Sequence, residues 1–133
     1  MKTLIVDDVV DNRVLLKGYL ASVSHCDLVK DGFEAVGLFE DAIREGEPYD
    51  LVLLDIMMPE MDGQETLKRL RQLEQDHGRT GSLEVAILMV TAIDSPREAM
   101  RSFFDGYCTD YLVKPVSRQT LFAKLSELNL IQS

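Results

Sequence analysis

The alternation of apolar segments along the chain is the feature that most constrains its fold. Short apolar runs of strand length alternate with longer stretches in which apolar residues recur at helical spacing. The runs are residues 3–6, 26–29, 51–54, 85–90 and 111–113. Three of them are apolar almost throughout, which is typical of parallel strands covered by helices on both faces. The sequence therefore predicts an α/β fold.

The stretches between the runs have the spacing of amphipathic helices. In the second stretch, apolar residues fall at i, i+3, i+4, i+7 and i+8, on one helical face: Ala35, Leu38, Phe39, Ala42 and Ile43. Three other helices are marked by Leu16, Leu20 and Val23, by Leu67, Leu70 and Leu73, and by Leu121, Leu125 and Leu128. A fourth in chain order should begin at Ser95-Pro96-Arg97-Glu98, a capping box with proline at the first helical position, and end near Gly106. Five strand–helix units connected by right-handed crossovers give an open parallel sheet with helices on both faces.

Length and charge limit the classes of function. The 133 residues contain no linker or repeat, and we expect a single domain over residues 1–133 with no output module. The net charge of −9 disfavours nonspecific binding to nucleic acid or anionic membranes, because both depend on clustered Lys and Arg. No apolar run approaches the roughly 20 residues needed to span a bilayer, so we expect a cytoplasmic protein with neither kind of partner.

Polar residues follow four of the five predicted strands. Asp7-Asp8 follows the first, Asp55 the third, Thr91-Ala92 the fourth and Lys114-Pro115 the fifth. Each residue alone is weak evidence of a functional site, because an aspartate at a strand end commonly caps a turn and a single lysine is usually solvated. The carboxyl ends of parallel strands, however, meet at the edge of the sheet where ligands bind. We therefore expect these side chains to form one site.

A group of neighbouring carboxylates indicates a cation-binding site. Three clustered carboxylates repel each other and raise one another's pKa unless a positive charge neutralises them. Oxygen ligands without His or Cys select a hard divalent ion, of which Mg²⁺ fits best. Lys114 and the Thr91 hydroxyl could then bind phosphoryl oxygens. A carboxylate nucleophile with a metal and a lysine, and no evident general base, indicates phosphoryl transfer to Asp55.

These motifs resemble those of a known family. Asp7-Asp8, the DIMMPEMDG stretch around Asp55, Thr91-Ala92 and YLVKP at 111–115 resemble the receiver domains of two-component response regulators, including the single-domain chemotaxis-type members. The resemblance covers essentially the whole chain. It implies a flavodoxin-like, doubly wound (βα)5 fold whose five-stranded parallel sheet has the order 2-1-3-4-5.

The resemblance also implies a role for each residue of the acidic edge. Asp55 would be the phosphoacceptor and, with Asp8, a direct ligand of Mg²⁺. Asp7 would act largely through metal-bound water, and Met57 would contribute its main-chain carbonyl. The side chain of Met57 would then be free to vary.

Three further positions follow from the same resemblance. Lys114 would pair with the aspartate or its phosphate, and Lys114-Pro115 would be a cis peptide. Thr91 and Tyr111 would form the switch, with the Thr91 hydroxyl turning toward the phosphoryl group and Tyr111 moving inward behind it. Phosphorylation would thereby shift the population between two arrangements of the fourth and fifth helices and the strand between them.

The function implied is that of a signalling switch and not of an enzyme in the usual sense. A sensor histidine kinase or a histidine phosphotransfer protein would donate the phosphoryl group from a phosphohistidine. The chain would catalyse only its own phosphorylation and dephosphorylation. A target protein would dock on the fourth helix, fifth strand and fifth helix, with the chain a monomer or a phosphorylation-linked dimer.

Three alternatives remain open at this point. The chain could be a receiver cut from a hybrid kinase or a longer regulator. It could be a phosphatase or phosphotransferase of the haloacid dehalogenase type, although these require a second Asp two residues after the nucleophile, where this chain has Met57. It could also be a pseudo-receiver that only binds partners, which the complete set Asp8, Asp55, Thr91 and Lys114 disfavours.

The lifetime of the phosphoryl group is a separate expectation. The residues two beyond the phosphoacceptor and two beyond the switch threonine are Met57 and Ile93, and both are apolar. Neither side chain can orient an attacking water. We expect the phosphoaspartate to hydrolyse more slowly than in receivers with acid or amide groups at these positions.

Overall fold

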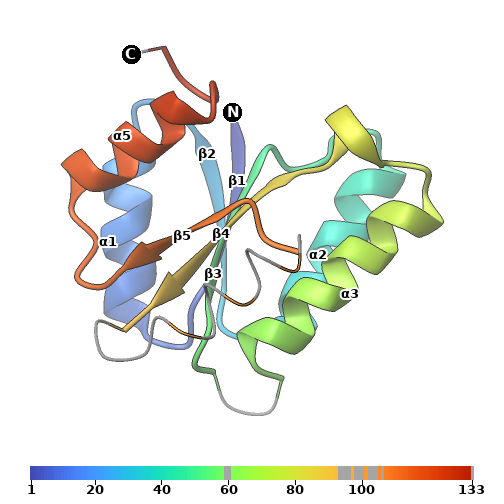
Figure 1. Cartoon of the computed structure of the whole chain (residues 1–133), viewed down its shortest axis with the longest axis horizontal. Coiled ribbons are helices and arrows are strands. Elements are labelled where there is room, and N and C mark those ends of the chain that lie inside the picture. The colour runs from blue at the N-terminus through green and yellow to red at the C-terminus, as the bar shows by residue number, and fades with distance from the viewer. Residues whose placement is uncertain (59–60, 93–96, 98–100, 102–104, 106, 133) are drawn as a thin grey trace.

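The structure is a computed structural model that describes residues 1–58, 61–92, 97, 101, 105 and 107–132. Over residues 2–91 and again over residues 110–127, its strands and helices alternate along the chain as predicted (Figure 1). The strands are β1 (Lys2–Val6), β2 (His25–Val29), β3 (Leu51–Asp55), β4 (Ala86–Thr91) and β5 (Asp110–Val113). The helices are α1 (Val10–Leu20), α2 (Gly32–Arg44), α3 (Gly63–Asp76) and α5 (Arg118–Glu127), with a 3-10 turn at Gly81–Leu83.

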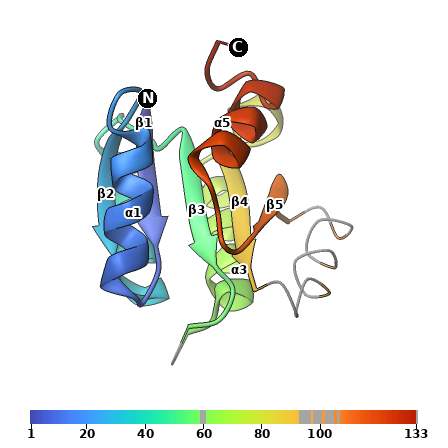
Figure 2. The ribbon, with the colours of Figure 1, turned by 90° about the vertical axis from the view of Figure 1, so that its left-hand side faces the viewer.

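The sheet has the predicted topology. Its five strands are parallel, in the order β2-β1-β3-β4-β5, so the chain reverses its direction of travel across the sheet after β2. Helices α1 and α5 cover one face, and α2 and α3 cover the other (Figures 1 and 2). The doubly wound α/β fold is therefore confirmed, with β3 and β1 in its interior.

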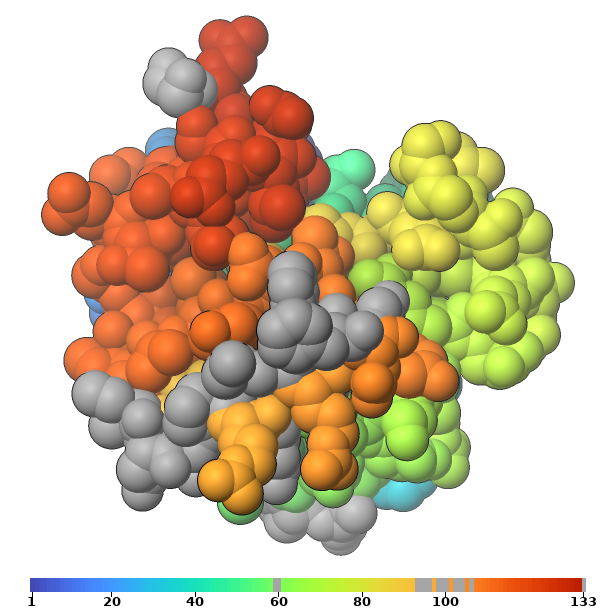
Figure 3. Space-filling view, in the orientation of Figure 1, coloured from blue at the N-terminus to red at the C-terminus, as the bar shows by residue number. Residues whose placement is uncertain are grey.

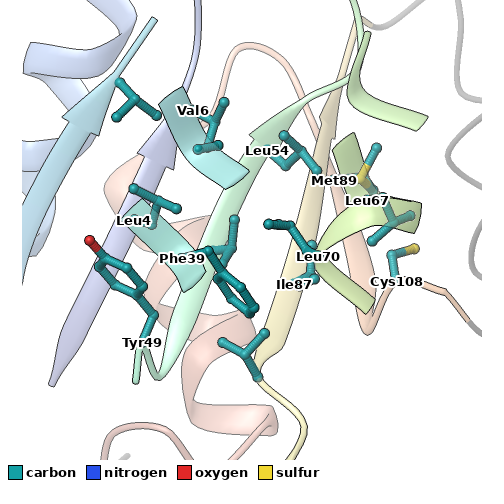
Figure 4. Close-up of a cluster of buried hydrophobic side chains, with 14 of the residues drawn as sticks. Leu4, Val6, Phe39, Tyr49, Leu54, Leu67, Leu70, Ile87, Met89 and Cys108 are labelled. Atoms are coloured by element: carbon teal, nitrogen blue, oxygen red, sulfur yellow. The ribbon is translucent and has the colours of Figure 1, made fainter. Parts of the chain in front are cut away.

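Each face of the sheet has its own hydrophobic core. In β1, Leu4 and Val6 point into the core beneath α2 and α3, where Phe39 and Leu70 pack (Figure 4). Ile5, between them, points to the opposite core beneath α1 and α5. This alternation follows from the two-residue period of a strand, and it explains why the central runs are apolar at consecutive positions.

The ends of the helices show one correction and one untested prediction. Helix α1 ends at Leu20, so the prediction that Val23 lies on this helix was wrong. A turn in which the Leu20 carbonyl accepts from the amides of Val23 and Ser24 ends the helix, although Val23 still packs against the α1–α5 core. Ser95, Pro96, Glu98 and Gly106, which mark the predicted fourth helix, lie outside the described residues. Among the described residues, no helix is long and apolar enough to cross a membrane.

A buried ion pair connects α3 to the segments that precede β4 and β5. Glu74 is 2% exposed, and its carboxylate accepts from Arg71 at 2.7 Å and from the amide of Val85 at 2.6 Å. The guanidinium of Arg71 also donates to the carbonyls of Val85, at 2.9 Å, and Tyr107, at 2.6 Å. Arg71 thus joins the last turn of α3 to the segments that enter β4 and β5.

Two arginines of α3 should differ sharply in their contribution to stability. Arg71→Ala removes the positive partner of a buried carboxylate and the side-chain donor of two carbonyls, which should lower the free energy of unfolding by about 3–5 kcal/mol. Arg69 instead pairs with Glu65 at 3.1 Å between side chains about half exposed, so Arg69→Ala should cost less than about 1 kcal/mol. Urea unfolding of both variants measures the difference, and equal losses would contradict the assignment.

Candidate functional site

The predicted polar residues meet at one edge of the sheet. Asp55 is the last residue of β3 and Thr91 the last of β4, while Asp7 and Asp8 follow β1 and Lys114 follows β5. Ligand oxygens of Asp7, Asp8 and Asp55 all lie within 4.8 Å of one another. This is the sole such cluster of metal-binding side chains among the described residues. Because β1 and β3 are neighbours in the sheet, the fold brings these carboxylates together.

The three carboxylates differ in exposure. Asp7 is 2% exposed and Asp55 is 4% exposed, whereas Asp8 is exposed to solvent. One carboxylate oxygen of Asp7 accepts from the amide of Val9 at 2.8 Å, and one of Asp55 accepts from the amide of Met57 at 3.2 Å. Two acids are therefore fixed at the base of the site, and the third stands at its opening.

Lys114 supplies the positive charge closest to these acids. Its ammonium lies 3.4 Å from the Asp55 carboxylate and 3.9 Å from that of Asp7. The pKa of Asp55 is nevertheless raised, first by burial and then by the charge of Asp7, which together outweigh the opposing effect of Lys114. One lysine does not balance this cluster, and its all-oxygen donors are those that a hard divalent cation prefers.

Strands β4 and β5 fix the opposite wall. The amide of Lys114 donates to the Thr91 carbonyl at 2.7 Å, and Thr91 is 1% exposed. The peptide bond between Lys114 and Pro115 is cis, as the resemblance implied. Tyr111, the second predicted switch residue, is half-buried and packs against the α2–α3 core. Thr91 and Lys114 are thus part of the same edge as the carboxylates, and Tyr111 lies against the core behind it.

The loop after β3 is held close to Asp55. The amide of Gly63 donates to the carbonyl of Ile56 at 2.9 Å. A β-carbon at position 63 would collide with the carbonyl oxygen of Asp55 and lie 2.7 Å from the α-carbon of Ile56. Glycine is therefore required here for lack of space. Met57, in the same loop, is 66% exposed.

Two features of the site were not predicted from the sequence. Arg13 of α1 donates to the Asp7 carbonyl at 2.6 Å, a contact with the backbone that no side-chain pattern could indicate. A hollow of about 360 Å³ lies beside the acids, between α1 and the segment after β5. Asp7 and Lys114 form its border with the carboxylate cluster, and Leu15, Pro115 and Val116 contribute apolar lining.

Comparisons with known proteins agree with this geometry. The model of the response regulator receiver domain family matches residues 3–126. The transcriptional regulatory protein TcrA of Mycobacterium tuberculosis is 34% identical over 130 residues, which cover 97% of this chain and 46% of TcrA. The chain spans about half the length of the curated relatives it matches first.

Solved structures give the same result. The receiver domain of Ssk1 from Saccharomyces cerevisiae, crystallised with the histidine phosphotransfer protein Ypd1, is 31% identical with a TM-score of 0.80, covering 99% of this chain and 90% of that one. The chemotaxis protein CheY4 of Vibrio cholerae is 29% identical with a TM-score of 0.75, covering 95% and 96%. With its sheet order, its acidic edge and these matches, the chain belongs to the response regulator receiver domain family.

Proposed function

We propose that this chain is a phosphorylatable switch in which Asp55 accepts a phosphoryl group from a phosphohistidine. A carboxylate oxygen of Asp55 attacks phosphorus, the P–N bond to the donor imidazole breaks, and the nitrogen keeps the electron pair. The observation that carries the proposal is the position of Asp55, buried at the end of a central strand with a lysine at 3.4 Å and two further acids beside it. The chain would catalyse this transfer and the later hydrolysis, and no other reaction.

A divalent cation is part of the proposal, and Mg²⁺ is the ion we expect. Asp8 and Asp55 would bind it directly, the Met57 carbonyl would be a further ligand, and Asp7 would act through metal-bound water. The raised pKa of Asp55 supports this assignment, because burial and then the charge of Asp7 together outweigh the effect of Lys114. When bound, the ion neutralises charge on the transferred phosphoryl oxygens.

The remaining residues of the edge hold the phosphoryl group. Lys114 is close enough to Asp55 to bind a phosphoryl oxygen once the aspartate is modified. The Thr91 hydroxyl would bind another, and its movement together with Tyr111 would carry the signal. Both switch assignments stay predictions.

Phosphorylation itself is directly measurable. Intact protein incubated with acetyl phosphate and Mg²⁺ should gain the mass of one phosphoryl group, and neither Asp55→Asn nor wild-type protein in EDTA should do so. Because a short-lived phosphoaspartate can escape detection, beryllium fluoride binding provides a second test. If the wild-type chain neither gains mass nor binds beryllium fluoride, the chain is a phosphorylation-independent docking domain.

Burial of Asp55 and its repulsion from Asp7 in the metal-free cluster predict a pH-dependent stability. The folded-state pKa of Asp55 is raised, so its ionised form destabilises the native state at neutral pH. In EDTA, Asp55→Asn should therefore unfold at higher urea concentration than wild type at pH 7. The gain should disappear as the pH falls through the folded pKa toward the ordinary value of 3.8, because wild-type Asp55 is then protonated in both states. A variant less stable than wild type at pH 7 would refute the repulsion.

The side chain of Met57 should set how long the signal lasts. It is exposed beside the phosphoacceptor and has no group that can orient water. Met57→Asn introduces an amide at this place and should shorten the half-life of the phosphoaspartate several-fold, measured by loss of the phosphoryl mass after the donor is removed. An unchanged half-life would show that position 57 does not control hydrolysis. Ile93, the other predicted position, lies outside the described residues.

The proposed donor-docking surface is α1 with the adjoining hollow. Val10, Val14 and Leu15 are apolar yet 58%, 58% and 49% exposed, and Leu15 lines the hollow together with Asp7 and Lys114. Apolar residues exposed together on a soluble protein indicate a protein contact. Ssk1, a relative of this chain, has been crystallised with a histidine phosphotransfer protein, which supports a partner of that kind here.

Two leucines allow a matched test of this surface. Leu15→Asp should slow phosphorylation by a phosphotransfer protein that is active on the wild-type chain, yet leave the rate with acetyl phosphate unchanged. Leu38→Asp is the control, because Leu38 is also an exposed helical leucine, at 38%, but belongs to α2 on the opposite face. Equal slowing by both variants, or by neither, would exclude α1 as the docking surface.

The output side of the switch is proposed on the resemblance alone. The target would bind the fourth helix, β5 and α5, and in Figure 3 α5 (red) and the β5 region (orange) lie together on the face toward the viewer. Val113 of the edge strand β5 is 36% exposed there, and Tyr107 nearby is 40% exposed. A stand-alone cytoplasmic receiver over residues 1–133, monomeric or dimerising on phosphorylation, stays the preferred hypothesis. A piece of a longer regulator or hybrid kinase is the alternative, since the first relatives are about twice as long.

A further inference from the structure

Arg13 holds the backbone of the acidic loop, and none of the roles assigned above includes it. It lies in the first half of α1, half-buried, and its guanidinium donates to the carbonyl of Asp7 at 2.6 Å. Helix α1 begins without a side-chain cap, since its N-cap residue is Val9. The contact therefore joins the helix to the loop that carries both N-terminal acids.

Every polar group of Asp7 has a partner, and Arg13 is the partner of its carbonyl. The Asp7 amide donates to the Val29 carbonyl at 3.2 Å, and its two carboxylate oxygens face the Val9 amide and Lys114. The carbonyl belongs to the peptide plane shared with Asp8. Because that plane is rigid, a hydrogen bond to its oxygen also fixes the amide nitrogen and α-carbon of Asp8.

Asp8 has little else to orient it. In the described part of the chain its carboxylate is exposed and makes no hydrogen bond or ion pair. Its position in the cluster therefore depends on the direction of the backbone that carries it. We propose that Arg13 is a positioning residue that sets the peptide between Asp7 and Asp8 and so aims the Asp8 carboxylate at the cation. The proposal rests on the magnesium site proposed above.

The charge of Arg13 acts in the opposite sense. A guanidinium close to the site repels a divalent cation, so removing it could also tighten binding. The repulsion acts through space on the ion, whereas the hydrogen bond from Arg13 to the Asp7 carbonyl, at 2.6 Å, acts directly on the backbone of the ligand Asp8. We expect the geometric effect to dominate. The two effects predict opposite signs for the same substitution.

Calorimetric titration of the protein with Mg²⁺, without a phosphoryl donor, distinguishes the geometric effect from the charge effect. Arg13→Met should raise the Kd for Mg²⁺ about tenfold, the lower end of the loss seen when a group that orients a metal ligand is removed. Arg13→Lys, which keeps the charge and one donor, should fall between this variant and wild type. Lys17→Met is the control, because it removes the same charge from an exposed position one turn further along α1. Thermal unfolding in EDTA shows that each variant is folded.

The outcomes separate the hypotheses. Mg²⁺ binding by Arg13→Met as tight as wild type, or tighter, would overturn the positioning role. If Arg13→Met does not fold, Arg13→Lys decides, and a Kd unchanged from wild type overturns the proposal. A lower unfolding temperature in EDTA with an unchanged Kd would make Arg13 merely structural. If wild-type protein does not bind Mg²⁺, the proposed metal site itself is wrong. If wild-type protein binds Mg²⁺, and Asp8→Asn weakens this binding but Arg13→Met does not, only the proposed role of Arg13 is rejected.

Discussion

Repulsion between carboxylates is the interaction around which this structure is arranged. Asp7 and Asp55 are nearly inaccessible to water and lie side by side, which isolated acids in solution would avoid. The sheet keeps them together because β1 and β3 are hydrogen-bonded neighbours whose residues are buried on both faces. The stability of two hydrophobic cores thus holds a local arrangement that is unfavourable by itself. A cation bound among these carboxylates would relieve their repulsion.

Much of this arrangement was predictable because strand ends are visible in the sequence. Asp55 and Thr91 terminate apolar runs, so the residues at the acidic edge could be named before their distances were known. Parallel pairing then brings such ends to one edge whatever the details of the helices. The cis bond before Pro115 was different, since no residue pattern implied it and only the family resemblance did.

The features that the sequence did not predict concern the position of the backbone. Arg13 and Arg71 both donate to backbone carbonyls of segments brought close by folding, and a carbonyl has no residue-specific signal in the sequence. The end of α1 was misplaced because Val23 is apolar at helical spacing, and it packs against the core from a turn instead. Local periodicity therefore located the buried side chains more reliably than it located the backbone that carries them.

The close packing of Gly63 on the backbone of Asp55 has a consequence for how such a chain can change over time. Position 63 cannot vary without displacing the main chain of Asp55 and Ile56, whereas the side chain of Met57 is 66% exposed and has room for most replacements. Under the proposed function, the placement of Asp55 depends on this close backbone contact, whereas the exposed side chain of Met57 contributes to the lifetime of the phosphoryl group. Substitutions at position 57 could then change the lifetime of the phosphorylated state over evolution without altering the ability of the chain to accept a phosphoryl group.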